Sequence, residues 1–180
     1  ADNRLYATRG IGGTLELRGA IDGFGSSASF FRAWTTLKAI RGLSPNVRSV
    51  FRADIGWIST GQFRELPPSI RFFAGGDNSV RGYDLDELGP KDDEGNVIGG
   101  RYLAVLSLEL ERRIVGKWSA AVFLDAGNAF NRFDDIDLKL GTGIGVRWRS
   151  PVGLARLDLG LPLDDADDPF QIYITVGPEF

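Results

Sequence analysis

The side chains of this chain that could carry out chemistry are mostly carboxylates, because its 180 residues include no histidine and no cysteine. Without them, histidine-assisted catalysis, thiolate chemistry and the commonest metal ligand are excluded. Glu109 and Glu111 are the most suggestive pair, since two carboxylates can serve a hydrolase. Residues two positions apart in a strand, however, share a face whatever their role. We therefore predict that the chain is not an enzyme and uses no cofactor or metal ion.

A second group of candidate residues lies in a segment of about forty residues, 61–100, that shows no strand periodicity. Its centre reads Val80-Arg81-Gly82-Tyr83, and the stretch around it combines apolar residues, glycines and one arginine. Loops of this length are uncommon in compact domains unless they are functional or disordered. Glycines also let a backbone approach another part of a protein closely. We therefore predict a functional loop that packs against the rest of the chain.

The elements that must position this loop are predicted from apolar and polar residues that alternate with a period of two. Most of these segments are near the length of about 9–11 residues with which a tilted strand crosses a bilayer. One face of each segment is aliphatic and aromatic, whereas the other is charged and rich in glycine. A soluble sandwich and an outer-membrane barrel would both show two such faces. About eight segments follow this pattern, at residues 11–21, 31–39, 51–57, 102–111, 118–127, 138–149, 156–163 and 170–180.

The connections between these segments favour the barrel. Short turns opposite long external loops are typical of outer-membrane barrels. No apolar run is long enough for a transmembrane helix, and a net charge of −3 indicates no nucleic-acid partner. The predicted fold is all-β, an antiparallel up-and-down transmembrane β-barrel fragment of about eight strands, with the long loop between the third and fourth. It would lie in the lipid of a bacterial outer membrane. Short connections at 44–46, 115–117 and 150–153 alternate with longer, acidic ones at 22–27, 61–100, 131–137 and 164–169.

Several motifs resemble those of the TamA family, within the BamA/TamA/FhaC superfamily of outer-membrane assembly and secretion proteins. Val80-Arg81-Gly82-Tyr83 resembles the lumen-loop motif of the family. Residues 123–127, which read Phe-Leu-Asp-Ala-Gly, resemble the strand motif that faces that loop. The likeness covers the chain from about residue 66 onward, and before that it rests on the strand pattern alone. Further similar segments are 116–118, 141–148, 150–153 and 176–180.

This resemblance implies that the chain belongs to the barrel of a factor that helps to insert or secrete other outer-membrane proteins. The partners it implies are membrane lipid, substrate outer-membrane proteins and a TamB-like periplasmic protein. Arg81 is expected to point into the lumen, where Asp125 is its best carboxylate partner and Glu109 its second. A two-partner secretion pore of the FhaC type and a passive small outer-membrane barrel are the alternatives.

The resemblance also implies a seam, at which the first strand of a full barrel closes against residues 170–180. In the family this seam is thought to open and accept a substrate strand, which is a form of β-augmentation. Gly177 and Pro178 favour weak closure, because glycine weakens a strand and proline cannot donate a ladder hydrogen bond. The terminal Phe180 resembles the assembly signal of outer-membrane proteins. An ordinary terminal strand with an aromatic anchor explains these residues equally well.

The family pattern further implies that only part of a barrel is present. Members carry periplasmic POTRA domains and a sixteen-stranded barrel, whereas residues 1–180 resemble only the last eight strands. We therefore expect residues 1–180 to be a single C-terminal barrel (bacterial surface antigen) domain, with POTRA domains absent. The interior of an eight-stranded barrel is just filled by side chains, so the long loop would not fit there. Either the chain pairs with another half-barrel, or the loop lies outside, or the chain is part of something larger. Because open edges template strand pairing, we expect half-barrels to self-associate.

Overall fold

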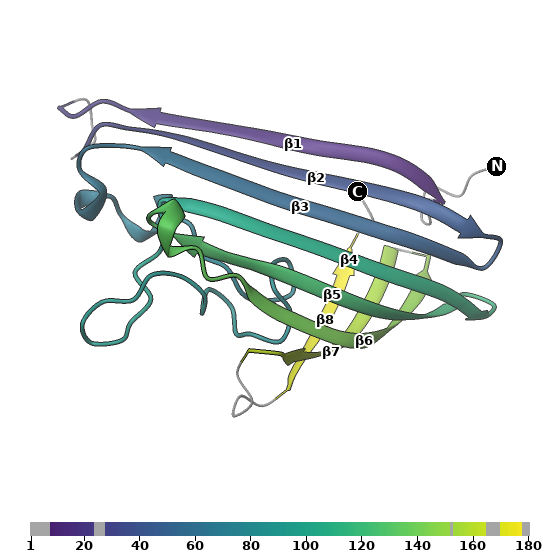
Figure 1. Cartoon of the computed structure of the whole chain (residues 1–180). Coiled ribbons are helices and arrows are strands. Elements are labelled where there is room, and N and C mark those ends of the chain that lie inside the picture. The colour runs from purple at the N-terminus through teal and green to yellow at the C-terminus, as the bar shows by residue number, and fades with distance from the viewer. Residues whose placement is uncertain (1–7, 24–27, 152, 165–169, 178–180) are drawn as a thin grey trace.

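The computed structural model describes residues 8–23, 28–151, 153–164 and 170–177, and these form one antiparallel sheet of eight strands (Figure 1). Each strand pairs with the next one in the sequence. The predicted all-β, up-and-down fold is therefore confirmed. The strands are β1 (Arg9–Ala20), β2 (Phe30–Ser44), β3 (Val47–Ser59), β4 (Tyr102–Val115), β5 (Trp118–Phe130), β6 (Lys139–Ser150), β7 (Gly153–Pro162) and β8 (Gln171–Gly177).

The connections are sorted by length between the two ends of the sheet. Two residues separate β2 from β3, β4 from β5 and β6 from β7, and we call this end the short-turn rim. The opposite end, which we call the long-loop rim, carries the other connections, including residues 60–101 between β3 and β4. Strands β2 and β3 reach closer to their turn than the alternation predicts. The reason is that their pairing continues to Ser44 and Val47, past a register shift at Gly42.

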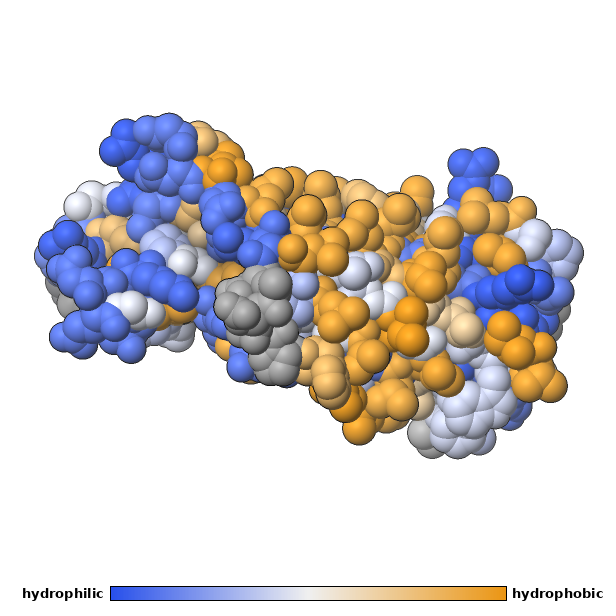
Figure 2. Space-filling model, turned by 60° about the horizontal axis from the view of Figure 1, so that its bottom comes forward, coloured by the Kyte–Doolittle hydropathy of each residue, from blue (hydrophilic) through white to orange (hydrophobic). Residues whose placement is uncertain are grey.

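The two faces of the sheet differ in chemistry, because successive side chains of a strand point to opposite sides. The outward face exposes large apolar side chains such as Leu15, Ile144 and Ile174. Figure 2 shows a broad apolar area with hydrophilic residues toward both ends. An apolar outside around a polar inside is the arrangement of a barrel that faces lipid. The inward face instead holds buried charged residues, namely Arg32, Arg48, Asp54, Glu109, Glu111, Asp125, Arg147 and Asp158.

The long loop, residues 60–101, has a structure of its own. It contains 3₁₀ turns at Phe63–Glu65 and Pro68–Ile70, and an isolated bridge pairs Phe72 with Gly100. The loop lies within the curve of the sheet (Figure 1). Its apolar side chains share one buried cluster with side chains of β3, β4 and β5, which includes Leu66, Phe72, Val80, Tyr83, Leu88, Ile58, Leu103, Val105 and Ala129.

The sheet also has two unpaired edges. Within the described residues, β1 pairs only with β2, and β8 pairs only with β7. The alternative in which the long loop lies outside is therefore wrong, because an open, curved sheet leaves room for it on the inward face. In the same part of the chain, no helix is long and apolar enough to cross a membrane.

Candidate functional site

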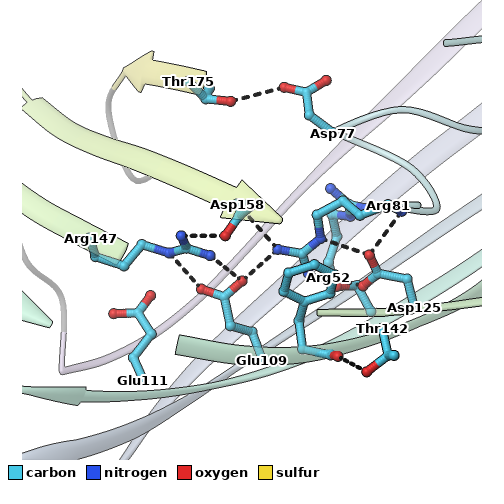
Figure 3. A network of polar contacts seen from close by, with 12 residues as sticks. Arg52, Asp77, Arg81, Glu109, Glu111, Asp125, Thr142, Arg147, Asp158 and Thr175 are labelled. Atoms are coloured by element: carbon cyan, nitrogen blue, oxygen red, sulfur yellow. Dashed lines mark hydrogen bonds and ion pairs between the residues drawn. The ribbon is translucent and has the colours of Figure 1, made fainter. Parts of the chain in front are cut away.

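Arg81, near the middle of the long loop, contacts carboxylates of two neighbouring strands (Figure 3). Its Nε donates to Oδ2 of Asp125 on β5 over 2.7 Å, and its Nη2 donates to Oδ1 of the same carboxylate over 3.0 Å. Its Nη1 donates to Oε2 of Glu109 on β4 over 2.8 Å. The backbone N–H of Arg81 also donates to Asp125, over 3.1 Å. Both side chain and backbone of the motif are thus fixed to the sheet.

A second arginine completes the network from β6. Arg147 donates from Nε and Nη2 to the two oxygens of Glu109, over 2.9 and 2.8 Å. Its Nη1 donates to Asp158 on β7 over 2.6 Å, and the other oxygen of Asp158 lies 3.3 Å from Nη1 of Arg81. Two arginines and three carboxylates therefore connect the loop to four strands. Sequence reasoning missed Arg147 and Asp158 as site residues, although both occur on the polar faces of their predicted strands.

The site is buried and strongly stabilises positive charge on Arg81. Asp125 is fully buried and Arg81 is 5% exposed. The guanidinium carbon of Arg81 lies 3.5 Å from the ring centroid of Phe123, which is a cation–π contact. Burial by itself would lower the pKa of Arg81, but the hydrogen bonds and charges of Asp125 and Glu109 outweigh it and raise that pKa. The arginine therefore stays charged and works as an anchor.

Glycines allow the loop to lie directly against the sheet. Gly82 has a φ of +108°, which favours glycine, and a Cβ there would come within 2.7 Å of the backbone between Leu161 and Pro162. A Cβ on Gly141 of β6 would overlap the carbonyl oxygen of Arg81. The glycine-rich inward faces of β6 and β7 are thus the surface on which the motif sits.

The other two residues of the loop motif are also buried. Val80 is fully buried within the apolar cluster, and Tyr83 is 4% exposed. The hydroxyl of Tyr83 lies 3.3 Å from the carbonyl oxygen of Leu140, at the start of β6. The four motif residues thus lie inside the curve of the sheet, and none is part of an exposed surface turn.

The last strand touches the loop as well, which sequence reasoning did not predict. The hydroxyl of Tyr173 on β8 donates to the carbonyl oxygen of Tyr83 over 2.7 Å and accepts from the N–H of Gly82 over 2.9 Å. Two residues further along β8, the hydroxyl of Thr175 lies 3.1 Å from Oδ2 of Asp77 (Figure 3). The inward side chains of β8 therefore hydrogen-bond to the long loop.

Of the predicted seam residues, only Gly177 lies in the described part of the chain. It is the last residue of β8, where it pairs with Leu154 of β7. Pro178 and Phe180 lie outside the described residues.

The acidic stretch in the long loop forms a turn. Oδ1 of Asp92 accepts backbone N–H groups of Glu94 and Asn96, over 3.0 and 2.8 Å. The N–H of Asn96 is the main reason that the pKa of Asp92 is lowered. This carboxylate thus has a local structural role in closing the turn.

The contacts of the site favour anchoring over acid–base chemistry. Glu109 is held by two arginines, and Glu111 pairs with Arg48 at 2.7 Å. A carboxylate fixed in this way accepts charge-assisted hydrogen bonds from its arginine partners. The arrangement can hold a loop against the inner wall of a barrel.

Comparison with known proteins identifies the family. A family model for the Omp85 superfamily domain matches residues 1–180. The chain belongs to the Omp85 superfamily. Together with the exposed apolar face, similarity to the BamA proteins of two bacteria places the chain in the bacterial outer membrane. The broader part of the resemblance seen in the sequence is thereby confirmed.

Several relatives resemble this Omp85 chain over most of its length. The outer membrane protein assembly factor BamA of Nitratidesulfovibrio vulgaris is 32% identical over 156 residues, which are 82% of this chain and 20% of that protein. A SAM50-like protein of Schizosaccharomyces pombe is 27% identical over 183 residues, covering 90% of this chain and 38% of that protein. BamA of Neisseria meningitidis is 27% identical over 214 residues, which cover 96% of this chain and 27% of that protein. The chain therefore spans well under half the length of these relatives.

A solved structure supports the fold. The crystal structure of BamA from Haemophilus ducreyi lacking POTRA domains 1–3 superposes with a TM-score of 0.76 at 21% identity. The match covers 96% of this chain and 39% of that chain. The open sheet of the Omp85 chain thus has the fold of part of a larger barrel protein.

Proposed function

We propose that this Omp85 domain is part of the membrane-embedded barrel of an assembly factor, which helps to insert or secrete other outer-membrane proteins. It would act without covalent chemistry, and residues 1–180 would form a single C-terminal barrel domain. The observation that carries the proposal is the seating of Arg81 on Asp125 and Glu109. Burying charges costs free energy unless they are paired, and apolar side chains could fill a lumen without that cost. Because five charged residues hold one loop here, we favour a functional role for the loop over a passive small barrel.

The loop motif and the strand motif around Asp125 favour a TamA-like factor with a TamB-like periplasmic partner. A pore of the FhaC type, which would pass a polypeptide outward, is the second candidate because it would carry the same barrel. The domains that precede the barrel would discriminate between the two candidates. Three POTRA domains favour the TamA-like factor, and two favour the pore of the FhaC type.

We further propose that the free edge of β8 forms one side of a seam, which the first strand of the full barrel closes and at which a substrate strand is received. An edge strand offers unpaired N–H and C=O groups, which lipid cannot satisfy. A substrate strand could pair there by β-augmentation. When residues 1–180 are produced by themselves, the free edges of β1 and β8 would pair between copies, so that half-barrels self-associate.

The functional test replaces Arg81 by alanine in the full-length protein. We expect a severalfold lower level of a dependent outer-membrane protein, because the loop loses its charged anchor while the outward face is unchanged. Quantitative immunoblotting of outer membranes measures that level together with the level of the factor itself.

The matched control is Arg132→Ala, because the Arg132 side chain is 69% exposed and, among the described residues, pairs with its near neighbours Asp134 and Asp135. It should leave the dependent protein unchanged. Normal levels of the dependent protein in the Arg81→Ala strain would contradict the proposed role of the motif.

A further inference from the structure

The outward face of the sheet carries very little charge. Along the described strands, the outward residues that are charged are Arg9 on β1, Arg41 on β2 and Arg112 on β4. The carboxylates of these strands are all on the inward face, namely Glu16, Asp54, Glu109, Glu111, Asp125 and Asp158. The outward face is thus apolar apart from three arginines.

All three arginines lie toward the short-turn rim. Arg9 is the first residue of β1, and Arg41 and Arg112 each lie three residues before the end of their strand. The stacked rings of Trp118 and Trp148 are on the same face at this rim, with centroids 5.8 Å apart. Tryptophan is enriched where lipid headgroups meet water. The arginines therefore lie near the level of the headgroups.

Two of these arginines face each other directly. Arg9 and Arg41 are cross-strand partners, and side chains in such positions have Cβ atoms about 4.5–5.5 Å apart. Like charges placed directly opposite are destabilising. Neither arginine side chain, nor that of Arg112, forms an ion pair or hydrogen bond with any described residue. An anion from outside the chain would remove the repulsion.

We propose that Arg9, Arg41 and Arg112 bind the phosphate groups of anionic phospholipids in the leaflet at the short-turn rim. The fork of N–H groups on a guanidinium matches the oxygens of a phosphate, and basic residues at a membrane surface attract anionic lipid. Exposed apolar side chains next to the arginines, such as Ile11 and Leu110, would contact the acyl chains. Short turns are periplasmic in outer-membrane barrels, so this leaflet is the one that contains phospholipid.

The charge of the opposite rim supports this choice of ligand. The long-loop rim exposes carboxylates of several connections, whereas the described residues of the short-turn rim include Lys117 and no exposed Asp or Glu. An anionic headgroup is therefore attracted to one end of the barrel and repelled from the other.

The experiment measures which lipid stays bound to the full-length protein. The protein is equilibrated in micelles with equal amounts of phosphatidylglycerol and phosphatidylethanolamine, and native mass spectrometry counts the lipids retained. The unsubstituted protein should retain phosphatidylglycerol preferentially. Replacing Arg9, Arg41 and Arg112 together by glutamine should lower that preference about fivefold or more. An unchanged preference would overturn the proposal.

Controls distinguish the effect of charge from that of the position of the substituted residue, and lipid from free phosphate. Arg→Lys at the same three positions keeps the charge and should retain part of the preference, whereas Arg132→Gln at the other rim should change nothing. If soluble glycerol 3-phosphate bound as tightly as the lipid, the site would recognise a free phosphate and the lipid would be the wrong ligand.

A second measurement uses unsubstituted arginines, so it does not depend on how the triple variant folds. Within residues 1–180 of a Trp57→Phe protein, the outward tryptophans are Trp118 and Trp148 at the short-turn rim. Phosphatidylglycerol brominated in its acyl chains should quench their fluorescence more than brominated phosphatidylethanolamine does. Equal quenching would contradict the site.

Discussion

At the scale of residues, the geometry of the Arg81 guanidinium matters as much as its charge. Three of its nitrogens reach Asp125 and Glu109, and a lysine ammonium could not span both carboxylates. We therefore expect Arg81→Lys to lower the free energy of unfolding by about 1.5–3 kcal/mol, the worth of a hydrogen bond to a charged group. Urea unfolding in lipid vesicles measures this change.

The comparison variant for this measurement is Arg132→Lys on the surface of the long-loop rim. Its effect should stay within about 0.5 kcal/mol, as is usual for exposed positions. If Arg81→Lys were no more destabilising than this variant, the charge alone would be enough to seat the loop.

At the scale of elements, Tyr173 links the terminal strand to the loop. Strand β8 has one strand neighbour among the described residues, and the Tyr173 hydroxyl adds two hydrogen bonds that do not depend on that neighbour. Tyr173→Phe removes both and leaves the N–H of Gly82 without this partner. We expect amide hydrogen exchange in β8 to rise about 2–10-fold, which corresponds to the loss of one net hydrogen bond. Exchange measured by mass spectrometry tests this.

Tyr102→Phe on β4 is the matched control, because it removes a hydroxyl from an outward-facing tyrosine near the long-loop rim. Exchange in β8 should then be unchanged. Equal protection of β8 in both variants would show that β7 alone holds the last strand.

At the scale of the whole molecule, the open sheet must satisfy its edges. The backbone groups on the free side of β1 cannot hydrogen-bond to lipid, and those of β8 face the same difficulty. We therefore expect residues 1–180, produced alone in detergent, to form dimers or larger assemblies through these edges. Light scattering combined with size-exclusion chromatography gives the mass of the protein component. A purely monomeric protein would contradict the expected self-association.

Period-two alternation was enough to predict the strands and their two faces, because each strand has one side in lipid and one in a polar interior. The sorting of short and long connections favoured the antiparallel barrel over a sandwich. The alternation also placed Asp125 and Glu109 on the face toward which Arg81 points. Contacts that depend on the curvature of the sheet were decided only by the tertiary structure. Asp158 and Tyr173 lie 77 and 92 positions from Arg81 in sequence, and they meet the loop only because the sheet curls β7 and β8 around it. Alternation tells which way a side chain points, but it carries no information on how far a sheet bends or whether it closes. The position of the long loop on the inward face of an open sheet is therefore known only from the tertiary structure.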